Sequence, residues 1–327
     1  MKTKLALVTG GYSGEAVISY KSAKTIYDNL DKDLFDVYTI DIHPEGWYYK
    51  DEKGDKIEVD RGDFTLTING ELIKFDVAFI GLHGTPGEDG KLQGYFDLLG
   101  IPYTSCNAAT SAITFNKRYT VAVAAMADIK VAKSVHLFHH TPYDVKEVLE
   151  QLSLPVFVKP NNGGSSIGMS KVNVGEELEE ALQKAFKEDD QVLVEEMITG
   201  REFTVGVFKG DNKITVLPIT EVIAHKEFFD FEAKYEGKSS EITPAAIDAG
   251  WQEKLEAAAK KIYEVFNCNG VVRIDFIYNE KENVPYMLEI NTVPGQSEAS
   301  IIPQQVKTMG WTLNEFYKKL VQQALIA

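Results

Sequence analysis

Apolar runs and helical patterns alternate along the first hundred residues. Continuous apolar runs predict buried strands at residues 5–8, 37–42 and 76–81. Helices are expected at residues 17–30 and 92–99, the second ending at Gly100. Continuous apolar strands separated by helices are typical of a parallel sheet that is covered on both faces. We therefore expect an N-terminal parallel α/β domain at residues 1–105, with its ligands beyond the carboxyl ends of the strands.

The pattern changes twice after residue 105. A central region, residues 106–191, combines helices and strands, with helices at 117–127, 142–151 and 176–187 and strands at 156–159 and 169–172. A C-terminal region, residues 192–327, has an antiparallel pattern, with strands at 192–196, 203–208, 213–220, 271–277 and 285–290 and a helix at 252–266. Residues 221–245 form a long polar and aromatic segment. Structureless loops of that length in compact proteins are usually functional lids.

Two C-terminal segments, residues 273–276 and 287–291, alternate apolar and polar positions and predict a hairpin with one polar face. A hairpin centred near residue 282 places Arg273 opposite Asn291 and Asp275 opposite Glu289. The apolar face would enter a core and consists of Ile274, Phe276, Leu288 and Ile290. Oxygen ligands on two strands suit Mg²⁺, which commonly takes one or two carboxylates and substrate phosphates. A solvated strand face with incidental charges remains the alternative.

Composition and charge narrow the classes of function. The 327 residues are 44% hydrophobic and 25% charged, which is enough for a full core. The formal net charge of −15, without a long run of Lys or Arg, argues against a nucleic-acid or anionic-membrane partner. The first apolar run is too short for a signal peptide and no stretch approaches a membrane span, so a cytoplasmic protein is expected. Cys106 and Cys268 form no CxxC pair and are expected to be small buried residues.

Three glycine-containing loops follow predicted strands. Residues 161–168 (NNGGSSIG) come directly after Lys159 and Pro160, and successive N–H groups in such a loop can cradle phosphate. The loop has no Walker ending, and an ordinary hairpin loop would explain it as well. Residues 83–90 (HGTPGEDG) could orient a zwitterionic substrate or form a capped turn. Residues 10–15 (GGYSGE) lack the full GxGxxG pattern, which disfavours a nicotinamide domain.

Two further positions are candidates for ligand contacts. Gly295, just after the predicted hairpin, could offer its N–H group to an oxyanion beside Arg273, although a plain Pro-Gly turn is an equal alternative. Glu195, Glu196 and Glu202 flank a strand end, where an acid could hold a ribose or an adenine amino group or be a plain surface acid. No serine lies in a GxSxG motif, so a hydrolase triad has no support.

Taken together, and in this order, the motifs resemble those of the D-alanine–D-alanine ligase family of the ATP-grasp superfamily. They span nearly the whole chain and comprise residues 10–15 with 18–19, 83–94 (HGTPGEDGKLQG), 159–169 (KPNNGGSSIGM), 233–235, 273–275 and 288–300 (LEINTVPGQSEAS). The resemblance implies a three-domain ATP-grasp architecture in which the N-terminal α/β domain is followed by two α+β domains that clamp ATP. It also implies ATP-dependent joining of two D-alanine molecules through an acyl phosphate, for peptidoglycan precursors.

The resemblance assigns a role to each matching residue. The implied catalytic residues are Glu15, Ser165, Tyr235, Arg273 and Gly295. The implied substrate-binding residues are His83, Glu88 and Ser300. The implied ATP-binding residues are Lys117, Lys159, Ser166, Glu195, Glu196, Ile198, Glu202 and Lys234. The implied ligands of two Mg²⁺ ions, which Mn²⁺ could replace, are Asp275, Glu289 and Asn291. Partners other than D-alanine and ATP would be limited to a second copy in a homodimer.

Several positions depart from the family pattern. Ala16 and Gly163 differ from its common residues, Phe229 replaces an aromatic hydroxyl of the lid, and Gln296-Ser297 stands where Met-Thr is usual. These differences concern the lid and the first substrate site and leave the metal ligands intact. Two rival functions stay open: the same fold joining D-alanine to a hydroxy acid or another amino acid, and a nucleotide-binding protein without turnover. Tyr235 favours an amine nucleophile, and the complete set of cations and acids counts against a pure binder.

Overall fold

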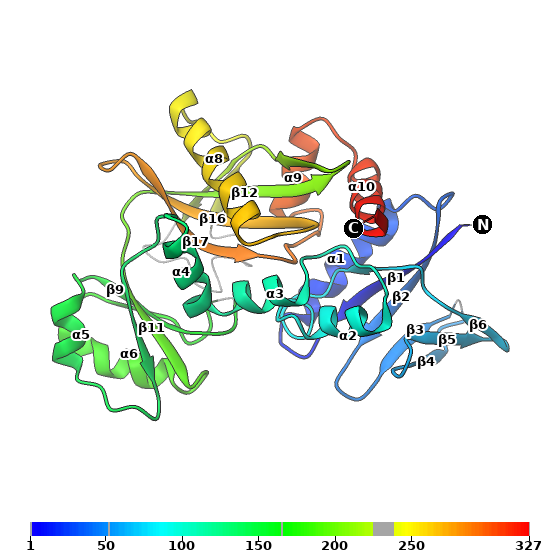
Figure 1. The fold of residues 1–327 in the computed structure, drawn as a ribbon, viewed down its shortest axis with the longest axis horizontal. Coiled ribbons are helices and arrows are strands. Elements are labelled where there is room, and N and C mark those ends of the chain that lie inside the picture. Colours follow the sequence, from blue (N-terminus) through cyan, green and yellow to red (C-terminus); the bar gives the residue numbers. More distant parts are fainter. Residues whose placement is uncertain (1, 52, 165, 225–238, 327) are drawn as a thin grey trace.

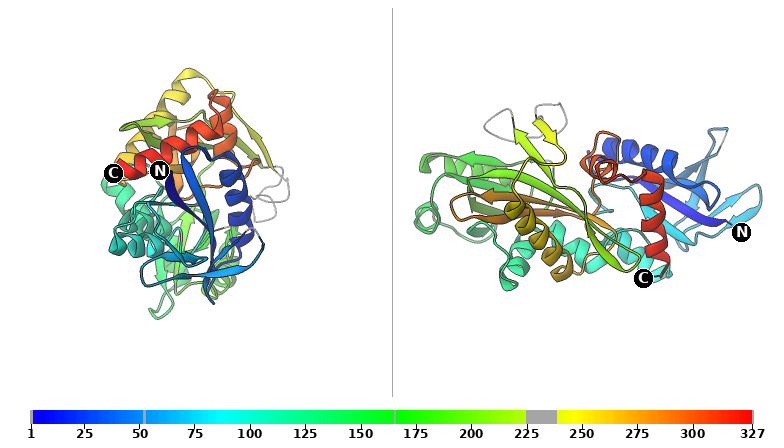
Figure 2. Two further views of the ribbon diagram at one scale, coloured as in Figure 1. Left: turned by 90° about the vertical axis from the view of Figure 1, so that its right-hand side faces the viewer. Right: turned by 90° about the horizontal axis from the view of Figure 1, so that it is seen from above.

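A computed structural model describes residues 2–51, 53–164, 166–224 and 239–326. Their strands form three sheets that lie one after another along the molecule (Figure 1). The N-terminal sheet occupies one end, the central sheet the other, and the C-terminal sheet lies between them, as the view from above also shows (Figure 2). No helix in the described ranges is long and apolar enough to cross a membrane. Ser165, Phe229, Lys234 and Tyr235 lie outside the described residues.

The N-terminal sheet is mixed rather than purely parallel. Its elements, in chain order, are β1 (Thr3–Gly10), α1 (Ala16–Asn29), β2 (Phe35–Ile42), β3 (Trp47–Lys50), β4 (Lys56–Asp60), β5 (Thr65–Ile68), β6 (Glu71–Ile73), β7 (Val77–Ile80) and α2 (Lys91–Leu99). The predicted strands β2, β1 and β7 are parallel neighbours, as expected. The prediction of an all-parallel domain was wrong for β3–β6, which extend the sheet by antiparallel pairing. Their short connections, such as Asn69-Gly70, permit only hairpins.

Helices cover both faces of this sheet, as predicted. On one face α1 packs together with α10 (Leu313–Ile326), the last helix of the chain, through Ile26, Phe316 and Tyr317. On the other face α2 contributes Leu92 and Phe96 to a second core. Figure 1 shows the C-terminal helix beside α1, so the end of the chain is part of the N-terminal unit. Loops from both ends of the sequence are thereby held close to each other.

The central sheet begins later in the chain than the predicted central region, residues 106–191, and also ends later, at Glu196. Its elements are β8 (Ser134–Phe138), α5 (Val145–Gln151), β9 (Val156–Pro160), β10 (Ser170–Val172), the 3₁₀ turn η1 (Gly175–Glu177), α6 (Leu178–Ala185) and β11 (Gln191–Glu196). The order is β10-β9-β11-β8, so β11 belongs here and the boundary predicted before residue 192 was too early. An apolar strand cannot show by itself which sheet it joins, and β8 was not predicted at all.

The C-terminal sheet holds the predicted hairpin at its edge. The elements of this unit are α3 (Ala108–Phe115), α4 (Lys117–Met126), β12 (Arg201–Gly210), β13 (Lys213–Val216), β14 (Thr220–Ala224), β15 (Ser239–Ile242), α8 (Ala249–Val265), β16 (Val271–Asn279), β17 (Val284–Asn291) and α9 (Ile301–Thr308). The strand order is β15-β14-β12-β16-β17. Helix α4, placed in the central region from sequence, and helix α3, which was not predicted, pack with α8 into the core of this sheet. The predicted lid segment begins and ends in the paired strands β14 and β15.

Candidate functional site

The hairpin of β16 and β17, here called the charged hairpin, has the predicted register. Arg273 pairs with Asn291, and Asp275 pairs with Glu289, so the four polar side chains share one face. The register shifts between Asp275 and Phe276, where Phe276 pairs with Met287 instead of Leu288. Met287 is therefore buried and Leu288 only half-buried, which corrects the core position predicted for Leu288. The bulge leaves the polar positions near the open end of the hairpin unaffected.

Asp275 is the centre of this polar face. Its carboxylate accepts two hydrogen bonds from the Arg273 guanidinium, at 3.0 and 2.9 Å, and one from the Asn291 amide at 3.2 Å. Thr204 of β12, which pairs with Asp275, donates its hydroxyl to the same carboxylate. Thr204 was not singled out from sequence, because which strand lies next to the hairpin cannot be derived from the local pattern. Asp275 is buried, and the arginine compensates its charge.

The chemistry of the oxygen donors on this face fits a hard divalent cation. Two carboxylates, Asp275 and Glu289, and one amide oxygen, Asn291, lie on two adjacent strands within reach of one ligand region. Oxygen donors of this kind, few in number, are what Mg²⁺ uses when phosphates complete its coordination. A cation there would replace part of the positive charge that Arg273 now supplies to Asp275. The residues present therefore fit the metal predicted for this hairpin.

The loop of residues 161–168 joins β9 to β10, as predicted, and contacts α4. Lys117 Nζ donates to the carbonyl oxygen of Gly163 at 2.8 Å, and the Asn162 backbone N–H donates to the Asp189 carboxylate at 2.8 Å. Gly163 has a φ of +99°, a conformation that suits glycine. The loop is thus anchored at both sides while Gly164 faces Glu15 of the N-terminal unit, since a Cβ at Gly164 would lie 3.2 Å from Glu15 Oε1.

Glu15 and Glu88 are neighbouring acids at the carboxyl ends of β1 and β7. Gly84, where the two loops meet, has a φ of +69°, which favours glycine, and a Cβ there would lie 2.6 Å from Glu15 Oε2. Glu88 Oε2 accepts the Gly84 N–H at 2.8 Å. Burial, reinforced by the negative charge of Glu15, raises the pKa of Glu88 to about 8. Two acids so placed form a site that is short of positive charge and suited to an ammonium group.

His83 joins two distant segments instead of facing the substrate region. Its Nδ1 lies 2.8 Å from the Val293 carbonyl oxygen and its Nε2 lies 2.8 Å from Ser22 Oγ. Because a carbonyl only accepts, Nδ1 carries the proton and Nε2 accepts from the serine hydroxyl. Ser22 Oγ in turn accepts the Gln296 N–H at 3.0 Å. Burial, with the charge of Arg273 adding to it, lowers the pKa of His83 to about 4 and keeps the ring neutral.

Ser22, His83, Val293 and Gln296 are called the His83 joint below. Both ring nitrogens are occupied within it, so the geometry does not support the substrate-binding role expected for His83. The joint fixes the loop that carries Gly295. A Cβ at Gly295 would lie 2.8 Å from Ser300 Oγ, so these two predicted residues are adjacent at the start of α9. Ser22 has no motif of its own and could not be found from sequence.

The residues predicted to bind adenosine differ in their surroundings. Glu195 forms an ion pair with Lys159 across β9 and β11. Glu196 Oε1 accepts the backbone N–H of Ser153 at 2.8 Å, so this acid has a structural contact in the central unit. Ile198 is half-buried beyond the end of β11, and Glu202 lies on β12 opposite Val222. The four residues follow the chain from β11 of the central sheet to β12 of the C-terminal sheet.

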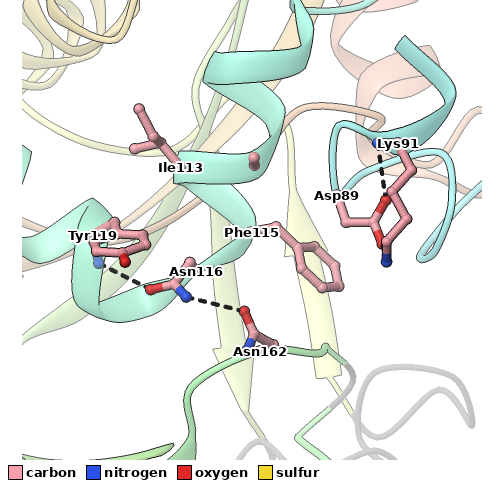
Figure 3. A pocket seen from close by; sticks show the side chains of 8 residues that line it. Asp89, Lys91, Ile113, Phe115, Asn116, Tyr119 and Asn162 are labelled. Carbon is pink, nitrogen blue, oxygen red and sulfur yellow. Dashed lines mark hydrogen bonds and ion pairs between the residues drawn. The ribbon is translucent and has the colours of Figure 1, made fainter. Parts of the chain in front are cut away.

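A cavity of about 470 Å³ lies where α2, the α3–α4 junction and the 161–168 loop meet (Figure 3). Its lining residues are Asp89, Lys91, Ala112, Ile113, Phe115, Asn116, Tyr119 and Asn162. The Asn116 amide bridges the Tyr119 N–H and the Asn162 side chain, at 3.1 and 3.2 Å. Asp89, Lys91 and Asn162 belong to the motifs at residues 83–94 and 159–169, but none of the residues to which the resemblance assigns a role lines this cavity. Its lining includes no residue of the charged hairpin either.

Known proteins match this chain over nearly its whole length. The family model described as "D-ala D-ala ligase N-terminus" matches residues 4–106, and the one described as "D-ala D-ala ligase C-terminus" matches residues 117–323. A D-alanine–D-alanine ligase of Flavobacterium johnsoniae is 44% identical over 98% of this chain and 99% of its own length. One from Flavobacterium psychrophilum is 46% identical over 92% of this chain and 91% of its own length.

Solved structures extend the likeness to the fold. The VanG D-Ala:D-Ser ligase of Enterococcus faecalis superposes with a TM-score of 0.88 at 32% identity, covering 99% of this chain and 100% of that one. A D-alanine–D-alanine ligase of Bacillus anthracis, solved with ATP, superposes with a TM-score of 0.80 at 25% identity over 99% and 97% of the two chains. The three-part architecture and the full-length matches lead to one conclusion. The chain belongs to the D-alanine–D-alanine ligase family and has its ATP-grasp fold.

Proposed function

We propose that this chain joins two molecules of D-alanine at the expense of ATP and so supplies a dipeptide for peptidoglycan precursors. The carboxylate of the first D-alanine attacks the γ-phosphorus of ATP, which gives D-alanyl phosphate and ADP. The amine of the second D-alanine then attacks the acyl carbon, and inorganic phosphate leaves. The observation that carries the proposal is the face of the charged hairpin, where Arg273, Asp275, Glu289 and Asn291 lie in register beside the Gly295 loop.

The residues of the N-terminal unit suit the first D-alanine. Its ammonium group would lie near the carboxylates of Glu15 and Glu88, which are adjacent and face the 161–168 loop. Its carboxylate would then point toward the charged hairpin. Arg273 and the N–H of Gly295 would stabilise the oxyanion of the tetrahedral intermediate, and Ser300, next to Gly295, would contact the second substrate's carboxylate. Ser165 and Tyr235 complete the proposed first site but lie outside the described residues.

The proposed ATP site lies between the central and C-terminal sheets. Lys117 and Lys159 flank the 161–168 loop and would neutralise phosphate oxygens, with Ser166 and Lys234 as further candidates. In the structure Lys159 is paired with Glu195, so binding of ATP would exchange this partner for a phosphate. The likeness to the Bacillus anthracis ligase solved with ATP supports ATP as the nucleotide. Since phosphoryl transfer depends mainly on alignment and charge neutralisation, these cations are the main contribution of the loop.

Asp275, Glu289 and Asn291 are the proposed ligands of Mg²⁺. When bound, the metal would neutralise charge that develops on the transferring phosphate oxygens. The protein's own contribution at this position is the fixed register of β16 and β17, which keeps all three oxygen donors on one face. The use of two ions, substitution by Mn²⁺, a cytoplasmic location and a homodimer all stay predictions.

Phosphate release is the direct test of the proposed function. Purified protein is mixed with ATP and Mg²⁺, with and without D-alanine, and the dipeptide is identified by mass spectrometry. We expect phosphate release that depends on D-alanine and equals dipeptide formation. Asp275→Asn should abolish it. Asp248→Asn, in the same unit, removes a carboxylate that caps α8 through the Trp251 N–H, and should keep the rate. Release without D-alanine, or none at all, would contradict the proposal.

The second substrate is tested in the same assay by competition. The solved neighbour from Enterococcus faecalis is named a D-Ala:D-Ser ligase, so D-serine and D-lactate are the informative competitors. With D-alanine in equal concentration to each competitor, we expect D-alanyl-D-alanine as the main product. A main product containing serine or lactate would keep the ATP-dependent ligation but move the chain to a different specificity.

A further inference from the structure

The central unit carries a group of metal-binding side chains that the proposed reaction does not use. His139 and His140 follow β8, and Asp190 directly precedes β11. One ligand atom from each of the three side chains lies within 4.8 Å of the other two. All three residues are exposed, so an ion and its waters can reach them. The group belongs to the central sheet, whereas the charged hairpin is part of the C-terminal sheet.

The backbone fixes the spacing of these ligands. Phe138 pairs with Gln191 at the end of the β8–β11 ladder, and the next residues, His139 and Asp190, are joined by an N–H to carbonyl hydrogen bond of 2.8 Å. A turn follows at once, closed by the Thr141 N–H to the Phe138 carbonyl at 3.0 Å. This turn brings the His140 ring back to within 5.1 Å of the His139 ring. Neighbouring side chains that would point apart in a strand therefore converge.

The His139 ring has a further support. It packs against Phe186, with the ring centroids 5.4 Å apart, and Phe186 stacks on Tyr143 at 5.9 Å. An imidazole held on an aromatic surface loses less conformational freedom when it binds a ligand. The turn that carries His139 and His140 directly follows the paired strand β8, and Asp190 directly precedes β11, so two paired strands hold the ligands from both sides.

We propose that His139, His140 and Asp190 bind one divalent transition-metal ion of the Zn²⁺ class, with water in the remaining positions. Imidazole nitrogen suits Zn²⁺, Co²⁺, Ni²⁺ and Cu²⁺, whereas Mg²⁺ and Ca²⁺ prefer oxygen ligands throughout. Two imidazoles and one carboxylate make a three-ligand set that leaves coordination positions open to water. The site thus differs in chemistry from the all-oxygen set on the charged hairpin, and the two should take different ions.

The position of Asp190 suggests what the ion would do. Its neighbour Asp189 accepts hydrogen bonds from both the N–H and the side-chain amide of Asn162, each at 2.8 Å. Its other neighbour, Gln191, accepts the Asn161 N–H at 2.9 Å. The segment that carries Asp190 is therefore the anchor of the 161–168 loop. An ion bound to Asp190 and to the β8 turn would act as a clamp on this anchor and stabilise the central unit.

The test measures binding of Zn²⁺, and separately Co²⁺, to the full chain after chelator treatment and removal of any affinity tag. Calorimetry is carried out in excess Mg²⁺, so that the hairpin is occupied by its own ion. We expect one equivalent of Zn²⁺ to bind and the thermal unfolding midpoint to rise. His139→Ala and His140→Ala should each weaken binding by at least about tenfold, since even changes around metal ligands cost roughly 10–100-fold. Ligase activity with Mg²⁺ should stay unchanged in both variants.

The matched control is His43→Ala. His43 is also partly exposed and lies 3.2 Å from an aspartate, Asp41, but the described residues place no second histidine there. We expect this variant to bind Zn²⁺ like the unaltered protein. Binding that persists in a His139→Ala/His140→Ala double variant, or that excess Mg²⁺ removes, would overturn the proposal. Failure to detect any bound Zn²⁺ at neutral pH would overturn it as well.

Discussion

The charged hairpin ends at Asn291, just before the loop that carries Gly295, and the His83 joint holds this loop at Val293 and Gln296. The two regions hold their residues by opposite means. In the joint a neutral ring, a hydroxyl and two backbone groups satisfy one another through hydrogen bonds of 2.8 to 3.0 Å. In the hairpin a carboxylate is held by a guanidinium, an amide and a hydroxyl. In the joint the His83 ring and the Ser22 hydroxyl each have two partners in a chain of hydrogen bonds, whereas in the hairpin the single carboxylate of Asp275 accepts from three side chains.

This difference indicates that the His83 joint is a positioning element and that the charged hairpin is the reactive one. The joint is buried and its histidine stays neutral because its pKa is lowered to about 4, so substrate charge does not change its contacts. A cation could replace the guanidinium that compensates the hairpin's carboxylate, and an oxyanion could compete with that carboxylate for Arg273. In the proposed mechanism Arg273 would then turn from Asp275 to the developing negative charge, while the loop that carries Gly295 stays in place. Substitutions in the His83 joint and in the charged hairpin should therefore change different properties of the protein.

The largest effect is expected for Arg273→Ala. Loss of one preorganised oxyanion donor typically lowers kcat by about 10²–10³. Arg201→Ala is a matched control, because Arg201 also binds a carboxylate with two nitrogens, that of Glu221 on the same sheet. Steady-state rates should show the loss for Arg273 alone, while Arg201→Ala stays within a few-fold. A near-normal kcat for Arg273→Ala would remove it from the mechanism and reduce the hairpin to a metal site.

The next effect concerns pH and the first substrate. Because the pKa of Glu88 is raised to about 8, its carboxyl is mostly protonated in the unliganded protein at neutral pH. An ammonium group favours the ionised form, so binding should release a proton, and affinity should rise with pH up to about 8 by at most about tenfold per pH unit. Calorimetry of D-alanine binding in buffers of different ionisation enthalpy measures this release.

Glu88→Gln should abolish this proton release and flatten the pH dependence, since glutamine keeps the acceptor for the Gly84 N–H. Asp89→Asn is the control: Asp89 is adjacent in sequence but pairs with Lys91 and Thr85. The same proton release in Glu88→Gln as in the unaltered protein would assign it to another group. The charge of Arg273 opposes the raised pKa of Glu88, so Arg273→Ala should shift the midpoint to higher pH.

A smaller effect on the rate, but a clear one on stability, is expected for Ser22→Ala. The change leaves His83 Nε2 without its donor and the Gln296 N–H without its acceptor. Each buried group left unsatisfied costs about 1–3 kcal/mol in the free energy of unfolding. A displaced Gly295 loop should also lower kcat by about tenfold. Thr25→Ala, on the same helix, removes a buried hydroxyl that bonds only within α1, to the Lys21 carbonyl, and should keep kcat.

The comparison also shows what the sequence could and could not predict. The register of the charged hairpin follows from local alternation and a short turn, so Arg273, Asp275, Glu289 and Asn291 were placed correctly. The joint depends on residues far apart in the chain, and nothing local marks Ser22 or the Gln296 N–H as partners of His83. The same limit explains β11: its pattern gives a strand, but its sheet is set by long-range pairing.

The smallest effect is expected for Tyr317→Phe, which tests how far the joint extends. Tyr317 of α10 is fully buried and donates its hydroxyl to Gln296 Oε1 at 3.2 Å. Removing this single hydrogen bond should lower the free energy of unfolding by about 1 kcal/mol and leave kcat within about twofold. Tyr263→Phe is the control, because this buried hydroxyl donates to the Gly270 carbonyl outside the joint. Tyr317→Phe could instead lower kcat as strongly as Ser22→Ala, while Tyr263→Phe did not. In that case α10 would belong to the positioning element. This C-terminal helix would then contribute to catalysis through the Gly295 loop.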